Sequence, residues 1–144
     1  MRFSKEGLSL PALQVHKKAI GEEAVIIIPT GSIDSSTAQD FKKFCEDAFS
    51  PSIRQVLLDM AGVKYISSIG LGALIGCFKE SQEKNCGFAL YDAPLPVRRV
   101  LEISRLDFLA LRPETLTPEN PFKDFVLTRE AQRLSEAKPE AKKS

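Results

Sequence analysis

Short apolar runs alternate with stretches of helical periodicity along this chain, and this alternation constrains the fold more than any other feature of the sequence. Residues 24–28 and 56–58 are apolar on both faces, and 24–28 is rich in β-branched side chains, which is typical of central strands. Apolar residues recur at helical spacing in 38–48 and in 71–78. Strands that alternate with helices in this way predict an α/β fold with parallel neighbours in the sheet.

Several element boundaries are predicted by turn, cap and breaker residues. The pattern predicts an edge strand at 13–16 and a last strand at 108–111. Pro29 has no N–H group to donate and should mark the end of its strand or a bulge. Ser36 and Gln39 fit a capping box at the start of the first long helix.

A change in composition divides the chain after residue 112. We expect one compact domain over 1–112, with its strands and helices within 12–112. In the extension 113–144, prolines interrupt the first residues and the pattern at 122–134 allows one helix. The end of the chain has few apolar side chains to bury and should be a disordered tail.

The composition narrows the classes of function. The 20 Lys and Arg nearly cancel the 19 Asp and Glu, and a net charge of +1 gives no electrostatic footprint for nucleic acid. No apolar stretch approaches the roughly 20 residues that a membrane span needs, so we expect no membrane partner. Cys45, Cys77 and Cys86 form no C-x-x-C pair, and residues 1–6 carry no apolar leader. These features favour a cytoplasmic protein with reduced thiols.

The sequence offers little support for catalysis. His16 is the only histidine, and no cluster of His, Cys and carboxylate residues has the spacing of a metal site. Ile66-Ser67-Ser68-Ile69-Gly70 lacks the first glycine of the nucleophile elbow of serine hydrolases. Gly70, Gly72 and Gly76 depart from the spacing of a dinucleotide loop, and close helix packing explains the last two better. We therefore expect no enzymatic activity, no cofactor and no metal.

Two loops that each lead into a helix are the strongest candidates for a functional site. They are residues 31–38, after the central strand, and residues 65–72. Such loops gather at one edge of an open α/β sheet. A helix N-terminus has unpaired N–H groups and a charge of about +0.5, which suits either a serine cap or a phosphate. From spacing alone, Ser67 and Ser68 are caps or phosphorylation sites, and Asp34 holds its own turn or faces a partner.

The two loops resemble motifs of the STAS domain family, specifically of bacterial anti-sigma factor antagonists. Gly31-Ser32-Ile33-Asp34-Ser35-Ser36-Thr37-Ala38 is similar to the family segment G-x-[LI]-D-x-x-[TN]-A. Ser67-Ser68-Ile69-Gly70-Leu71-Gly72-Ala73-Leu74 is similar to the signature D-S-[ST]-G-L-G-x-L, and residues 56–66 resemble the strand segment before it. The resemblance covers residues 12–112 and implies a mixed, mainly parallel β-sheet with helices packed against it.

The resemblance implies a protein that switches partners. Ser68 matches the serine that an anti-sigma factor serine kinase phosphorylates. The unphosphorylated form is implied to bind that kinase, phosphorylation to release it, and a PP2C-type phosphatase to reset the protein. The position before Ser68 is usually Asp in the family and is Ser67 here. The partner-binding residues that the match implies are Gly31, Asp34, Ser35, Ser36, Ser67, Ile69 and Gly70.

Other readings of the same sequence stay open at this point. A STAS module can bind a small ligand such as a nucleotide or a lipid, or act as an interaction scaffold that is not phosphorylated. Homodimer formation is also open. A serine hydrolase would require turnover of an ester substrate that depends on Ser68.

Overall fold

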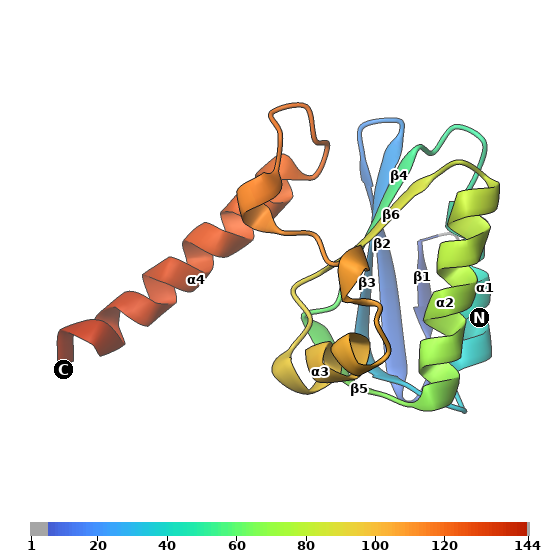
Figure 1. Cartoon of the computed structure of the whole chain (residues 1–144), viewed down its shortest axis with the longest axis horizontal. Coiled ribbons are helices and arrows are strands. Elements are labelled where there is room, and N and C mark those ends of the chain that lie inside the picture. Colours follow the sequence, from blue (N-terminus) through green and yellow to red (C-terminus); the bar gives the residue numbers. More distant parts are fainter. Residues whose placement is uncertain (1–5, 144) are drawn as a thin grey trace. The chain divides into compact units, whose positions relative to one another are not determined.

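A mixed β-sheet organises the structure, a computed structural model that describes the backbone of residues 6–143 and the side chains of residues 6–136. Within that part the sheet has six strands (Figure 1). The strands are β1 (Gly7–Ser9), β2 (Leu13–Ile20), β3 (Ala24–Ile33), β4 (Gln55–Asp59), β5 (Gly62–Ile66) and β6 (Gly87–Tyr91). The α-helices are α1 (Ala38–Ala48), α2 (Ser68–Glu83), α3 (Leu95–Ile103) and α4 (Lys123–Lys143), and the 3₁₀ turns are η1 (Asp107–Leu109) and η2 (Pro113–Thr115).

The longest strand, β3, is the centre of the sheet. The strand order is β1-β2-β3-β4-β6, and β5 also pairs with β3. The pairs β1–β2 and β2–β3 are antiparallel, whereas β3–β4, β3–β5 and β4–β6 are parallel. Parallel strands cannot be joined by a tight hairpin and need a long connection. The helix α1 provides this connection between β3 and β4, and α2 provides it before β6. The expected mixed α/β sheet with helices against it is confirmed.

The hydrophobic core lies between the sheet and the helices α1 and α2. The two helices pack beside each other on one face of the sheet (Figure 1). The sheet contributes Val25, Ile27, Val56 and Leu58, and the helices contribute Phe41, Phe44, Cys45, Leu74 and Cys77. The helical periodicity therefore predicted the buried face of α1 correctly. The three cysteines are free and buried, as expected, and burial raises the pKa of the Cys45 and Cys86 thiols.

Pro29 neither ends its strand nor forms the bulge that the sequence predicts at that position. It lies inside β3, opposite Val15 of β2. On the other side of β3, the pairing with β4 runs through Ile27 and the pairing with β5 begins at Thr30. The missing N–H group of Pro29 thus falls where β3 changes its parallel partner, so no ladder hydrogen bond is lost on that side. The irregularity in the pairing lies two residues later, between Gly31 and Ser32.

Two other expectations about the strands are wrong, and the strand β5 was not expected. The predicted edge strand is β2, which lies between β1 and β3, because the three residues of β1 are too few to show a period. The strand β5 was not predicted, since its exposed and buried residues do not alternate. The predicted last strand at 108–111 is replaced by η1 and an isolated bridge between Ala110 and Leu90.

The chain divides into two compact units, Met1–Leu111 and Arg112–Ser144. The second unit contains α4 (Lys123–Lys143), which begins one residue later than the helix allowed at 122–134 and also includes most of the tail for which disorder was expected. Side chains beyond residue 136 and the last residue lie outside the described part, and a domain boundary at residue 112 stays a prediction. Among the described residues, no helix combines the length and the apolar character of a membrane span.

Candidate functional site

The two loops that the sequence singles out meet at the last residue of β3. The carbonyl oxygen of Ile33 accepts a hydrogen bond from the N–H group of Ser67, with 3.0 Å between nitrogen and oxygen. Gly70, one turn further along α2, packs against the same carbonyl group so closely that a Cβ atom on Gly70 would overlap it. The first residues of α2 are therefore fixed against the point where β3 passes into the first loop.

A network of hydrogen bonds centred on Asp34 holds the first loop. The Asp34 carboxylate accepts from the Ser36 N–H at 2.9 Å and from the Ser36 hydroxyl at 2.7 Å. The carbonyl oxygen of Asp34 accepts from the N–H groups of Thr37 and Ala38. Asp34 thus holds its own turn, which is one of the two roles that the sequence left open.

Thr37 closes the same loop and was not singled out from the sequence. Its side chain is buried, its hydroxyl donates to the Ser32 carbonyl at 2.8 Å, and the same hydroxyl accepts from the Asp34 N–H at 2.9 Å. A threonine three residues after an aspartate was the available signal. The predicted capping box is wrong: the helix cap is Thr37, without a side-chain cap hydrogen bond, and the Ser36 hydroxyl is bonded to Asp34.

Gly31 is required by the backbone at the start of the first loop. Its φ of +124° lies in a region that L side chains rarely adopt, and a Cβ atom there would overlap the carbonyl oxygen of Ala12. That same oxygen accepts a hydrogen bond from the Ser32 N–H at 2.9 Å. The glycine therefore allows the turn before β2 to pack directly on the end of β3.

In the second loop the two adjacent serines have different roles. Ser67 is the cap of α2, because its hydroxyl accepts from the Gly70 N–H at 3.1 Å and its backbone is extended. Ser68 is the first residue of the helix, and its side chain is exposed. Ile69 follows with 58% of its surface exposed. The second residue of the pair thus lies open on the surface, while the first stabilises the helix.

The predicted site residues fall into an accessible group and a supporting group. Ser35, Ser36, Ser68 and Ile69 are exposed; Gly31, Asp34 and Ser67 are half-buried; and Gly70 is buried. Tyr65, at 55% exposure on β5, lies beside this surface and was not named as a site residue. Because the strand β5 was not predicted, the sequence carried no signal that Tyr65 is exposed.

Close packing was expected at both Gly72 and Gly76 of α2, and the structure shows it at only one of them. A Cβ atom on Gly76 would overlap the aliphatic part of Lys42 on α1, so this glycine does permit a close approach. Gly72 is exposed, and nothing lies within 4 Å of a Cβ atom built on it. The expectation was therefore wrong for Gly72.

The electrostatics of the first loop favour an ionised carboxylate. The hydrogen bonds from the Ser36 hydroxyl and the Ser36 N–H lower the pKa of Asp34 below its ordinary value of 3.8. Within the described side chains, no group of three or more His, Cys, Asp or Glu residues could hold a metal ion. His16 is exposed on β2, where it lies opposite Ile28 of β3 and not opposite a residue of either loop.

Sequence comparison identifies the family. The family model of the STAS domain matches residues 14–118. This chain belongs to the STAS domain family. A relative from Thermotoga neapolitana, named as an anti-sigma factor antagonist, is 33% identical over 89 residues, which are 61% of this chain and 79% of that protein. The resemblance drawn from the two loop motifs is thereby confirmed.

Solved structures share the fold of this STAS domain. An anti-sigma factor antagonist from Thermotoga maritima matches with a TM-score of 0.61 and 26% identity, over 67% of this chain and 82% of that one. SpoIIAA from Bacillus has been solved in two forms. The unphosphorylated form matches with a TM-score of 0.61 at 18% identity, covering 73% of this chain and 90% of that one. The phosphorylated form matches with a TM-score of 0.57 at 17% identity, covering 73% of this chain and 93% of that one.

The contact between Gly70 and the Ile33 carbonyl predicts opposite effects for two glycine substitutions in one helix. Gly70→Ala should destabilise the STAS domain by about 1–3 kcal/mol, because the backbone has to move to admit a Cβ atom. Gly72→Ala should stabilise it by about 0.8–1 kcal/mol, because alanine has the higher helix propensity and the site is open. Urea denaturation measures both. Equal stabilisation by the two substitutions would contradict the role assigned to the Ile33 carbonyl.

The hydrogen bonds to Asp34 predict an observable titration. The folded-state pKa of Asp34 lies below 3.8, so ionised Asp34 favours the folded loop above that pH, and this contribution is lost as the pH falls through the folded-state pKa. Ser36→Ala removes the hydroxyl donor and should move the pKa of Asp34 upward, as followed by NMR of the carboxyl carbon. Ser52→Ala, in the turn before β4, is the control and should leave that titration unchanged. An Asp34 titration at or above 3.8 in the unmodified protein would disprove the assignment.

Proposed function

We propose that this STAS domain is an anti-sigma factor antagonist, and that phosphorylation of Ser68 releases it from an anti-sigma factor serine kinase. One observation carries the proposal: the hydroxyl of Ser68 is exposed at the first position of α2, while the neighbouring Ser67 supplies the helix cap. Modification of Ser68 therefore leaves the cap hydrogen bond in place. The relatives named as anti-sigma factor antagonists, and the existence of SpoIIAA in two phosphorylation states, support the same function.

The phosphorylation step itself is carried out by the partner. The kinase would transfer the γ-phosphoryl group of ATP to the Ser68 oxygen, which loses its proton, and ADP leaves. Hydrolysis of that phosphoester by a PP2C-type phosphatase would return the free hydroxyl and release inorganic phosphate. The STAS domain contributes the acceptor oxygen and the surface around it, with no catalytic group and no cofactor of its own.

The free protein tolerates a phosphate on Ser68. The group adds about −1.5 to −2 charges at neutral pH. It would lie at the N-terminus of α2, where the first N–H groups have no partner within the helix and the dipole favours negative charge by about 0.3–1 kcal/mol. Because the side chain is exposed, water also solvates the phosphate. The fold should therefore remain intact after modification.

A partner interface built around the unmodified hydroxyl does not tolerate the phosphate. Ile69, with 58% of its surface exposed, and the exposed Tyr65 would place apolar groups around Ser68 in such an interface. Burying an unpaired charge among them costs on the order of 3–5 kcal/mol. At about 1.4 kcal/mol per decade, the affinity for the kinase falls by roughly 10²- to 10³-fold or more.

The proposed partner-binding residues divide by what each of them offers. Ser35, Ser36 and Ile69 are exposed and would touch the kinase directly. Gly31 and Gly70 fix the backbone beneath that surface, and the network of Asp34 and the cap at Ser67 hold the two loops in shape. A preformed surface of this kind loses little conformational entropy on binding.

A phosphomimetic series tests the proposal. Each purified anti-sigma factor serine kinase encoded by the source organism is assayed against the unmodified protein, Ser68→Ala and Ser68→Asp. The unmodified protein and Ser68→Ala should bind one kinase with similar affinity. Ser68→Asp should bind it at least 10-fold more weakly, because one added charge is a weaker perturbation than phosphate. Incubation with ATP should phosphorylate the unmodified protein at Ser68 and leave Ser68→Ala unlabelled.

The matched control is Ser52→Asp, which places the same charge on an exposed serine. Ser52 lies just before β4, at the end of the strands opposite to the end that carries the loops. This variant should bind like the unmodified protein. Equal binding by Ser68→Ala and Ser68→Asp, or no binding to any of the kinases, would overturn the proposed function.

A further inference from the structure

Several large apolar side chains are exposed on one surface of the α/β unit, next to the two loops and sharing Tyr65 with the second of them. They belong to β5, α3 and η1, and we call this surface the α3 face. Its apolar members are Tyr65 at 55% exposure, Leu95 at 50%, Ile103 at 82% and Phe108 at 65%. Scattered single apolar residues are normal on a protein surface, but side chains this exposed on neighbouring elements are typical of an interaction site.

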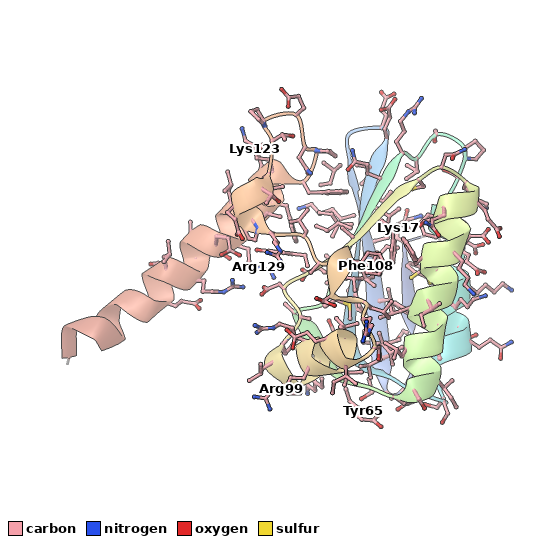
Figure 2. All side chains as sticks on the ribbon, viewed as in Figure 1. Lys17, Tyr65, Arg99, Phe108, Lys123 and Arg129 are labelled. Carbon is pink, nitrogen blue, oxygen red and sulfur yellow. The ribbon has the colours of Figure 1, made fainter. Side chains whose placement is uncertain are left out.

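The α3 face begins where the candidate site ends. The helix α3 packs beside β5 and contacts η1. Tyr65 on β5 lies only three positions before Ser68 in the chain. Figure 2 shows Tyr65 and Arg99 at the same end of the α/β unit, the end at which α2 begins. A partner seated over Ser68 and Ile69 can therefore reach α3 by crossing β5.

The aromatic part of the α3 face is held in place from beneath. The ring of Phe108 packs edge-on against the ring of Phe78 of α2, with 5.5 Å between the centroids and 72° between the planes. Such a contact stabilises a ring that is otherwise 65% exposed (Figure 2). An aromatic side chain that is ordered before binding is favoured at the centre of an interface, because little entropy is lost when the partner covers it.

The charged residues of the α3 face are mostly basic. The exposed cations are Lys64, Arg98, Arg99 and Arg105, and the exposed anions are Glu102 and Asp107. Apolar side chains within a rim of arginines match the composition of protein interfaces, in which aromatic residues and Arg are enriched. A second copy of this chain would bring the same excess of cations against it, which disfavours self-association through this face. The carboxylates of Glu102 and Asp107 offset part of the attraction of the cations to an anionic membrane. The charge pattern fits a protein surface with an apolar centre and an acidic rim.

We propose that the α3 face is a second contact surface for the anti-sigma factor serine kinase, which presents an apolar, acidic surface to it. This inference rests on the proposed function and adds a contact that phosphorylation does not alter. The loops carrying Ser68 decide whether the complex forms, and the α3 face selects which kinase is bound. Because its cations attract an acidic partner, the association rate depends on salt concentration.

Two variants of the α3 face test the inference on the kinase that binds in the phosphomimetic series. Ile103→Ser removes a side chain that is 82% exposed, so the fold remains stable, and should weaken binding about 10-fold. Arg99→Glu should weaken binding by a similar factor and reduce the dependence of the association rate on salt. The matched controls are Leu134→Ser, on an exposed leucine of α4, and Arg54→Glu, on an exposed arginine before β4, and both should bind normally.

The outcomes separate this inference from the proposed function. If Ser68→Asp releases the kinase while Ile103→Ser and Arg99→Glu bind within twofold of the unmodified protein, the α3 face is not a contact surface and the switch stands. In that case, sedimentation equilibrium and vesicles containing phosphatidylglycerol would assign the face to a second copy or to a membrane. If no kinase responds to Ser68→Asp, the proposed function fails first.

Discussion

The carbonyl group of Ile33 is the point on which the arrangement of the candidate site depends. It receives the N–H of Ser67 and lies against Gly70, so the first turn of α2 is joined to the last residue of β3. Asp34, the next residue, begins the hydrogen-bonded turn of the first loop. One backbone group thus sets the relative position of two segments that are more than 30 residues apart in the sequence.

The structure separates residues that hold the two loops in shape from residues that lie open on the surface. Ser67 caps α2 and Asp34 and Thr37 bond within their own loop, so the polar groups next to Ser68 are already engaged in the fold. Ser68 is left on the surface at the helix start. A charge can therefore be added at Ser68 with little effect on stability and a large effect on any surface that covers it.

Local chemistry in the sequence predicts part of this structure well. The β-branched run at 24–28 and the helical period behind Ala38 specify β3 and α1, because each signal is long and burial depends on it directly. The prediction from Pro29 was wrong because the cost of its missing N–H group depends on the strand that lies beside it. At Pro29, β3 changes its parallel partner from β4 to β5, so the missing group breaks no ladder hydrogen bond on that side. The loops were located from their motifs, whereas the bonds of Thr37 and the different roles of Ser67 and Ser68 depend on tertiary contacts.

The change of partner along β3 has a consequence for local opening of the fold. The first half of the strand is bonded to β4, which in turn is bonded to β6, whereas the second half is bonded to β5. The short β5 can detach without breaking a hydrogen bond of the β4–β6 ladder. Amide protons of β5 should therefore exchange with solvent through a smaller opening than those of β4.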